Sequence, residues 1–126
     1  MRTILTLLFG SLLLLTGCSN KLDDVVFTDN PYDDDYIGPD VIFIDNIVRD
    51  TAYNRNNIYY HVTFPNSDGV RLYKNGTVIA THYNSTTHTI FISDPYASSG
   101  YTYTYEVRLY AGGGESPSDP VIYTTP

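Results

Sequence analysis

The sequence predicts an all-β fold, a seven-stranded antiparallel β-sandwich over residues 40–126. Apolar and polar residues alternate at period two in several short runs, of which residues 101–111 are the longest, and such alternation is typical of strands with one buried face. Clusters of Gly, Pro, Asn and Asp separate the runs, as turns require. The composition of 13 Tyr, 5 Phe and no Trp also favours strands, and no helical period follows residue 20.

The first three strands are predicted from short alternating or apolar runs. Residues 41–44 are apolar and lie between a proline and an Asp-Asn pair, which suits a short first strand. Residues 58–64 alternate clearly, and the turn-forming residues 65–69 separate them from the third run, residues 70–73. The inward residues predicted for these runs are Ile58, Tyr60, Val62, Phe64, Val70 and Leu72.

Asn75 and Gly76 predict a tight hairpin after the third strand, because both residue types tolerate positive φ. The returning strand is predicted over residues 77–81 and the next over residues 87–93, with Ile90 and Ile92 inward.

Residues 101–111 predict the central strand of the fold, because theirs is the longest alternating run. The inward residues would be Tyr101, Tyr103, Tyr105, Val107 and Leu109. Three consecutive glycines then end the strand, and residues 121–124 supply the last one.

The start of the chain differs from the rest in composition. Residues 1–17 have a charged beginning and a short apolar core, which favours a secretory signal peptide. The alternative is a membrane-anchoring helix, but such a helix needs about 20 apolar residues.

Cys18 is the only cysteine of the chain, so no internal disulfide is possible. It ends the run Leu-Thr-Gly-Cys at residues 15–18, which resembles the lipobox of bacterial lipoproteins. The resemblance implies that Cys18 becomes the first residue of the mature chain and carries diacylglycerol and an N-acyl chain such as palmitate. Two or more acyl chains at about 0.8 kcal/mol per buried CH₂ give durable membrane attachment.

The residues after Cys18 resemble the sorting signals of the same lipoproteins. Ser19 resembles the residue that permits transfer to the outer membrane in Gram-negative lipoproteins. Residues 21–24, Lys-Leu-Asp-Asp, are similar to signals that export some of these lipoproteins to the cell surface.

Residues 18–39 are predicted to form an acidic tether. Aspartates broken by Asn-Pro and Gly-Pro pairs favour an extended spacer, although residues 25–27 and 36–37 are apolar enough to dock on the domain. Residues 29–35 also suggest a calcium loop, but they lack its central turn glycine and distal glutamate, which leaves a solvated charge run as the main interpretation.

The charge balance narrows the class of partner. Without residues 1–17 the chain holds six basic and fourteen acidic residues, a formal net charge of −8. Such a negative surface disfavours nucleic acid and anionic lipid headgroups as partners.

The domain as a whole resembles a fibronectin type III domain, a member of the immunoglobulin-like sandwiches. Residues 103–111 with 113–118 are similar to its sixth strand and following loop, and residues 70–76 to its third strand and hairpin. The resemblance implies that Tyr103 is the corner tyrosine, whose hydroxyl bonds backbone just upstream, and that Phe64 takes the place of the usual core tryptophan.

No pattern in the sequence predicts catalysis, a cofactor or a metal. His61, His82 and His88 fall on different runs and lack the tight local pair usual in zinc sites. No nucleophile motif or phosphate loop is present, and the two glutamates, Glu106 and Glu115, are too few to argue a hydrolase pair. We therefore expect a non-enzymatic protein.

The sequence favours a binding or structural role in the cell envelope. Tyr59, Tyr73, Phe91 and Tyr110 fall on the outward parity of their strands, where aromatic rings offer rigid contact area. The plain alternative is that these residues are simply good strand formers. The expected function is a lipid-anchored outer-membrane lipoprotein that acts as an interaction or structural module towards an envelope protein, and the alternative is a carbohydrate-binding module of a surface glycan-handling system.

Overall fold

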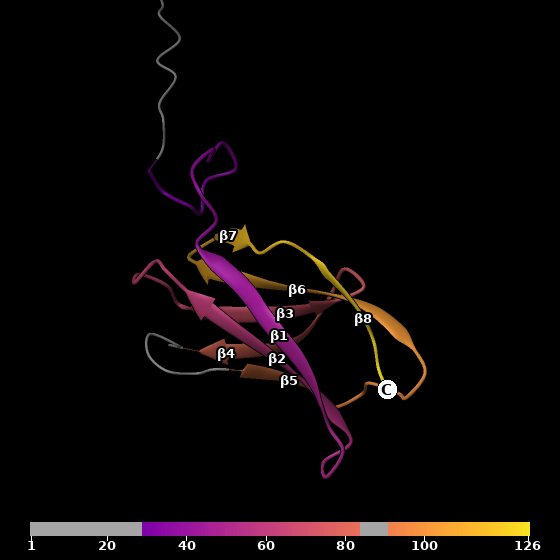
Figure 1. The fold of residues 1–126 in the computed structure, drawn as a ribbon. Coiled ribbons are helices and arrows are strands. Elements are labelled where there is room, and N and C mark those ends of the chain that lie inside the picture. The colour runs from indigo at the N-terminus through magenta and orange to yellow at the C-terminus, as the bar shows by residue number, and fades with distance from the viewer. Residues whose placement is uncertain (1–28, 84–90) are drawn as a thin grey trace, which may run out of the picture.

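The structure is a computed structural model that describes residues 29–83 and 91–126. These residues form two antiparallel sheets and no helix, so the all-β prediction is confirmed (Figure 1). In chain order the strands are β1 (Ile42–Asp50), β2 (Arg55–Val62), β3 (Gly69–Lys74), β4 (Thr77–Tyr83), β5 (Phe91–Asp94), β6 (Thr102–Ala111), β7 (Gly114–Pro117) and β8 (Val121–Thr124).

The two sheets share one hydrophobic core. The first sheet has the order β1-β2-β5, and the second has the order β4-β3-β6-β7, with β8 also paired to β6. Fully or nearly buried side chains from both sheets form the core: Ile42, Ile47, Ile58, Tyr60, Val70, Leu72, Ile92, Tyr105, Val107 and Leu109. The inner faces of the sheets therefore pack against each other as the layers of a sandwich do.

A β-bulge in β1 keeps three isoleucines on the buried face. The pairing register with β2 shifts between Ile44 and Asn46, so that Ile44 lies opposite Tyr60 and Ile47 opposite Ile58. Without the extra residue, a spacing of three would turn Ile47 outward, because side chains alternate along a strand. The prediction that β1 ends at the Asp-Asn pair was wrong, because this pair forms the bulge and the strand continues to Asp50.

The predicted Asn-Gly hairpin is present between β3 and β4. Asn75 has φ 51° and Gly76 has φ 82°, both left-handed, as a two-residue hairpin turn requires. The Asn75 side-chain oxygen also accepts the Thr104 N–H at 2.9 Å, which ties the turn to the neighbouring strand β6.

Strand β6 is the longest strand of the second sheet and lies in its interior, as predicted. Tyr105, Val107 and Leu109 are fully buried. Tyr103 is only half-buried, and Tyr101 lies before the strand and is 64% exposed, so the inward prediction was wrong for Tyr101. The alternation of residues 101–111 thus begins one residue before the sheet does.

The described residues form eight strands where seven were predicted. The additional strand, β7, pairs with β6. Its residues were predicted to be a loop because the residue that faces the core is a serine, Ser116, rather than an apolar residue. β2 begins at Arg55 and ends at Val62, so Phe64 lies outside it and is half-buried, although it packs against the core. Of the predicted strand 87–93, only the part within β5 lies in the described residues, so Ile90 lies outside them.

The loops gather at two ends of the sandwich. Residues 29–41 enter at the end that also holds the loops 63–68 and 112–113, which we call the entry end (Figure 1). The turns 51–54 and 75–76 and the loop 95–101 lie at the other end, which we call the distal end.

Candidate functional site

The outer face of the second sheet carries a closed network of charged and aromatic side chains, which we call the arginine face. Its members come from β3, β6 and β7: Arg71, Tyr73, Glu106, Arg108, Tyr110 and Glu115. Glu115 accepts hydrogen bonds from Arg71, from Arg108 at 3.1 Å and from the Tyr73 hydroxyl at 2.8 Å. Arg108 also pairs with Glu106.

The two arginines cover the tyrosine rings of this face. The Arg71 guanidinium lies 4.1 Å from the centroid of Tyr110, and that of Arg108 lies 4.0 Å from the centroid of Tyr73. Tyr110 faces outward as predicted, yet it is only 7% exposed, so the prediction that it offers a free ring was wrong. Tyr73 is half-buried under Arg108. These cation–π contacts leave little ring surface for a ligand.

The network also fixes the protonation of its members. Burial favours the neutral form of Glu115, but the hydrogen bonds from Arg71, Tyr73 and Arg108 outweigh it and lower the pKa of this carboxyl. Burial and the neighbouring Glu115 carboxylate raise the pKa of Tyr73. Glu115 is therefore a charged structural partner rather than a poised proton acceptor.

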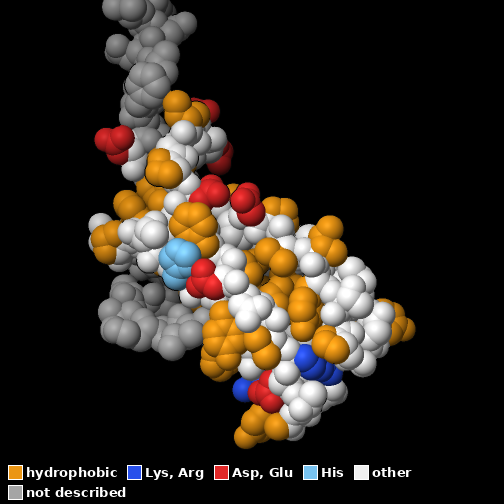
Figure 2. Space-filling view, in the orientation of Figure 1, with side chains coloured by type: hydrophobic (Ala, Val, Ile, Leu, Met, Phe, Trp, Pro, Cys, Tyr) orange, Lys and Arg blue, Asp and Glu red, His pale blue; other side chains and the backbone are white. Residues whose placement is uncertain are grey.

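The outer face of the first sheet carries aromatic rings that cations cover less closely, and we call it the aromatic face. Figure 2 shows hydrophobic side chains gathered over β1, β2 and β5. Tyr59 of β2 lies opposite Phe91 of β5, with ring centroids 5.3 Å apart and planes at 45°. Phe43 of β1 lies opposite His61 of β2, and their rings stack at 4.8 Å with planes at 14°. The predicted residues Tyr59 and Phe91 are thus brought together, on the sheet opposite Tyr73 and Tyr110.

The charged groups of the aromatic face pair with one another. His61 Nδ1 lies 2.6 Å from Asp45 Oδ1, and Arg55 Nε lies 3.1 Å from Asp50 Oδ2. The Arg55 guanidinium also lies 4.8 Å from the Tyr53 ring centroid and 5.9 Å from that of Phe91. Tyr53, in the turn after β1, is 73% exposed and extends the row of rings to the distal end.

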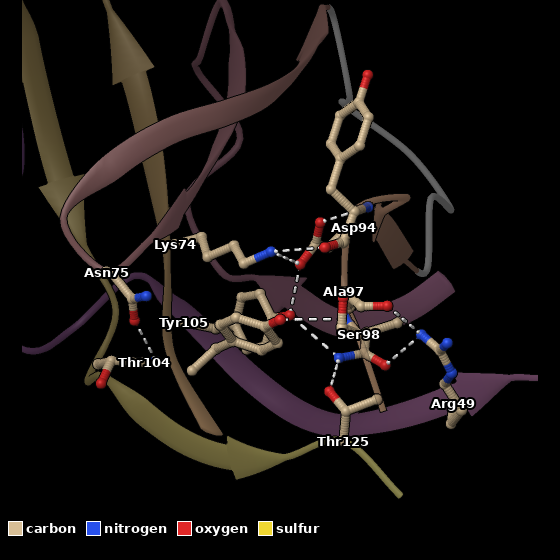
Figure 3. Close-up of polar contacts among 12 residues, drawn as sticks. Arg49, Lys74, Asn75, Asp94, Ala97, Ser98, Thr104, Tyr105 and Thr125 are labelled. Atoms are coloured by element: carbon tan, nitrogen blue, oxygen red, sulfur yellow. Dashed lines mark hydrogen bonds and ion pairs between the residues drawn. The ribbon is translucent and has the colours of Figure 1, made fainter. Parts of the chain in front are cut away.

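A buried polar cluster joins the two sheets at the distal end (Figure 3). Asp94 at the end of β5 is fully buried and pairs with Lys74 at 2.8 Å. The Tyr105 hydroxyl donates to the same carboxylate at 2.6 Å, and the Tyr96 N–H donates to its other oxygen at 2.9 Å. The buried carboxylate is therefore satisfied by one cation and two donors, which is what a stable buried charge requires.

The cluster continues to the C-terminus and to β1. The Asn56 amide donates to the Tyr105 hydroxyl at 3.1 Å and to Thr125 at 2.8 Å, and Asn56 and Thr125 are almost fully buried. Arg49 donates to the Ala97 carbonyl at 2.9 Å. Burial and the Asp94 carboxylate together raise the pKa of Tyr105 strongly, so the hydroxyl stays protonated and acts as a donor. This arrangement holds strands together rather than presenting a reactive group.

Lys74 and Tyr103 complete the same region. The Lys74 ammonium lies 4.0 Å from the centroid of the Tyr103 ring, and the Tyr103 hydroxyl accepts the Ser98 N–H at 3.0 Å. The bond to backbone five residues upstream is the one predicted for this tyrosine.

Residues 29–40 dock on the entry end through Tyr32. Its hydroxyl donates to the Asn66 carbonyl, and its ring meets Phe64 edge-on at 5.8 Å and 75°. Beside it lies an open cleft of about 320 Å³ between this segment and β7, with an acidic lining that includes Asp33, Asp34 and Glu115. A second, shallower groove of about 220 Å³ separates β1 from β8.

The run 29–35 forms turns in which side chains bond one another. The Asn30 amide donates to Asp33 at 3.0 Å and its carbonyl oxygen accepts the Tyr32 N–H at 3.2 Å. Within residues 29–83 and 91–126 no three His, Cys, Asp or Glu side chains group closely enough to hold a metal ion.

Three other residues named in the sequence analysis have different outcomes. Cys18, the predicted lipidation site, and His88 lie outside the described residues. His82 is partly buried, which lowers its pKa and favours the neutral ring.

Over the part of the chain that the structure describes, no helix has the length and apolarity to cross a membrane.

No family model, curated protein or solved structure matches this chain.

Sequence patterns did not reveal the buried polar cluster. Asn56 and Asp94 lie at strand ends, where polar residues usually mark a turn. The available signal was parity: Asn56 and Asp94 lie two residues from Ile58 and Ile92, so both share the inward face of their strands.

Proposed function

We propose that this chain is a lipoprotein of the outer membrane, anchored by lipid on Cys18, whose folded part is a non-catalytic interaction or structural module. The observation that carries the proposal is the run Leu-Thr-Gly-Cys at residues 15–18, directly after a short apolar segment and holding the only cysteine of the chain. The acyl chains would supply membrane attachment, so the folded part needs no apolar membrane-binding surface of its own.

The strand order supports a fibronectin type III-like module. Immunoglobulin-like sandwiches place their first, second and fifth strands side by side in one sheet, which is the order β1-β2-β5 found here. The other sheet follows β4-β3-β6, with β7 and β8 together in the place of a single last strand beside β6. The Tyr103 hydroxyl bond to Ser98 also fits the corner tyrosine of such domains.

The state of the buried charges supports a non-catalytic role. Asp94 pairs with Lys74 and accepts from the Tyr105 hydroxyl, and Glu115 pairs with Arg71 and Arg108, whose hydrogen bonds help to lower the pKa of the Glu115 carboxyl. A general acid or base needs access to a substrate and a pKa near the working pH. Asp94 is fully buried, and the pKa of Glu115 is lowered.

The docked segment fixes where the start of the described chain meets the sandwich. Tyr32 holds residues 29–40 against the entry end, so the chain reaches β1 from that end.

Expression of the full chain in a Gram-negative host tests the anchor. We expect mass spectrometry of the mature protein to show cleavage before Cys18 and the added mass of the acyl chains. We expect the Cys18→Ser variant to leave the membrane fraction, with Ser19→Thr as the control that stays in it. A mature chain that keeps residues 1–17 and a bare thiol would refute the proposal.

Protease treatment of intact and of broken cells then tests the orientation. Cleavage in intact cells indicates surface display, and cleavage in broken cells alone indicates the periplasmic side.

A further inference from the structure

We propose that the aromatic face binds a neutral oligosaccharide, with Tyr59, Phe91 and Tyr53 as the rings on which sugar units stack. The inference gives the interaction role proposed above a ligand class. It rests on that role but needs no lipid on Cys18.

The outward residues of β2 run along this face, and the rings of Phe91 and Tyr53 lie beside that strand. Outward residues of β2 recur every second position, and the inward partners Ile58 and Tyr60 fix this parity. From His61 through Tyr59 and Asn57 to Arg55 the row is about 20 Å long at about 3.4 Å per residue. A row of this length suits a chain of several sugar units rather than one.

The ring edges are braced from neighbouring strands. Phe91 of β5 packs beside Tyr59, and Phe43 of β1 stacks on His61. Each of these four rings contacts the ring opposite it on the neighbouring strand, and each is half-buried or exposed. Rigid, half-exposed rings lose little conformational entropy when a ligand stacks on them.

The charges of the face disfavour an anionic ligand. Asp45 lies against His61, and Asp50 pairs with Arg55. The Asp50–Arg55 pair carries no net charge, and the whole chain is acidic, which disfavours anionic ligands further.

The middle of the face carries polar groups beside an apolar side chain. Asn57 lies between Tyr59 and Arg55 on β2 and is only 7% exposed, and its side-chain oxygen accepts the Ser93 hydroxyl at 2.7 Å. Val48 of β1 lies opposite Asn57 and is 42% exposed. The part-buried Ser93 hydroxyl and Arg55–Asp50 pair lie beside the rings, and such groups suit a saccharide, whose C–H faces stack and whose hydroxyls form hydrogen bonds.

The opposite side of the sandwich provides the comparison. Tyr73 and Tyr110 also point outward there, but guanidinium groups at 4.0 and 4.1 Å cover both rings. On the aromatic face the Arg55 guanidinium lies farther from its rings, 4.8 Å from the Tyr53 centroid and 5.9 Å from that of Phe91, and no described cation lies over the Tyr59 ring. Cations therefore cover the described outward rings of the first sheet less closely than those of the second.

Binding is tested with the full mature chain carrying Cys18→Ser, which keeps it in solution. The probes are an array of neutral oligosaccharides and affinity gels containing a soluble β-glucan, an arabinoxylan, a galactomannan or starch, with alginate as the anionic comparison. We expect retention by at least one neutral glycan and none by alginate. We expect Tyr53→Ala and Tyr59→Leu each to raise the dissociation constant about tenfold, because each variant loses one stacking contact.

Tyr83→Ala is the matched control, because Tyr83 is 77% exposed on β4 of the other sheet. It should bind as the unsubstituted chain does. Tyr53 is 73% exposed, so its variant should also keep the unfolding midpoint and report on binding alone.

The inference would be overturned if the chain bound none of the neutral glycans, or if it bound alginate more strongly than the neutral glycans. It would also be overturned if the Tyr53 and Tyr59 variants bound as tightly as the unsubstituted chain. Loss of self-association in these variants without any glycan binding would show a protein interface instead. A chain that fails here but fractionates with membranes through Cys18 leaves the anchor standing, so the two proposals fail separately.

Discussion

Removing one hydroxyl from the buried polar cluster should destabilise the whole fold. In Tyr105→Phe the ring stays in the core, but Asp94 loses the donor at 2.6 Å and the Asn56 amide loses the acceptor at 3.1 Å. A hydrogen bond to a charged group contributes about 1.5–3 kcal/mol and a neutral one about 0.5–1.5 kcal/mol. Because Lys74 and the Tyr96 N–H still hold Asp94, we expect a loss of about 2–4 kcal/mol in the free energy of unfolding.

Urea unfolding of the mature Cys18→Ser chain measures this loss. With a slope of about 2 kcal/mol per molar urea, the midpoint should fall by about 1–2 M. The control is Tyr101→Phe, which removes a hydroxyl from a ring that is 64% exposed and should change stability by less than about 0.5 kcal/mol. If Tyr105→Phe costs no more than Tyr101→Phe, the cluster does not join the sheets as argued.

The same residue gives a second readout in alkali. Because the pKa of Tyr105 is raised in the folded chain, folding favours its protonated form, and this contribution is complete below the unfolded value of about 10. Stability should therefore fall as the pH rises above about 10, and part of that fall should vanish in Tyr105→Phe. An unchanged alkaline slope would contradict the assignment of the hydroxyl as a buried donor.

Three further changes test other parts of the fold. Glu115→Gln should lower the free energy of unfolding by about 1 kcal/mol at neutral pH. Because the pKa of Glu115 is lowered in the folded chain, the stability that the carboxylate contributes is present above the unfolded pKa of about 4.3 and is lost as the pH falls through the folded value. The stabilities of the two chains, measured against pH, should therefore converge in acid. Gly114→Ala places a methyl 2.4 Å from the Tyr32 carbonyl oxygen, so limited proteolysis should cut residues 29–40 faster while the rest of the fold stays resistant. Gly76→Ala has open space around its Cβ but φ 82°, so we expect a loss of about 1 kcal/mol from backbone strain alone, read as a lower melting temperature.

Strand positions were predictable where hydrophobic alternation and turn chemistry agree. The Asn75-Gly76 hairpin and the buried face of β6 follow directly from residue types, because positive φ and period-two burial are local requirements. The bulge in β1 was not predictable in this way. Asp45 and Asn46 have the composition of a turn, but the strand continues through them because the bulge places Ile47 in the core.

The candidate sites depend on contacts between strands that are distant in sequence. Outward parity was correctly read for Tyr73 and Tyr110, but parity does not tell whether an arginine lies over a ring. Likewise, each member of the buried polar cluster looks ordinary in its own segment. Lys74 and Asp94 become a pair only because β3 and β5 end at the same end of the sandwich.

The bulge in β1 also has a consequence for many copies confined to one surface. β1 is an outer strand of its sheet, and its free backbone edge could template growth of a continuous sheet from molecule to molecule. The register shift at Asn46 interrupts that edge, and the Asn46 side chain accepts the Ile47 N–H at 2.8 Å. Pro117 and Pro120 remove backbone donors beside the outer strands of the second sheet. Many copies held side by side would thus remain separate molecules rather than fibrils.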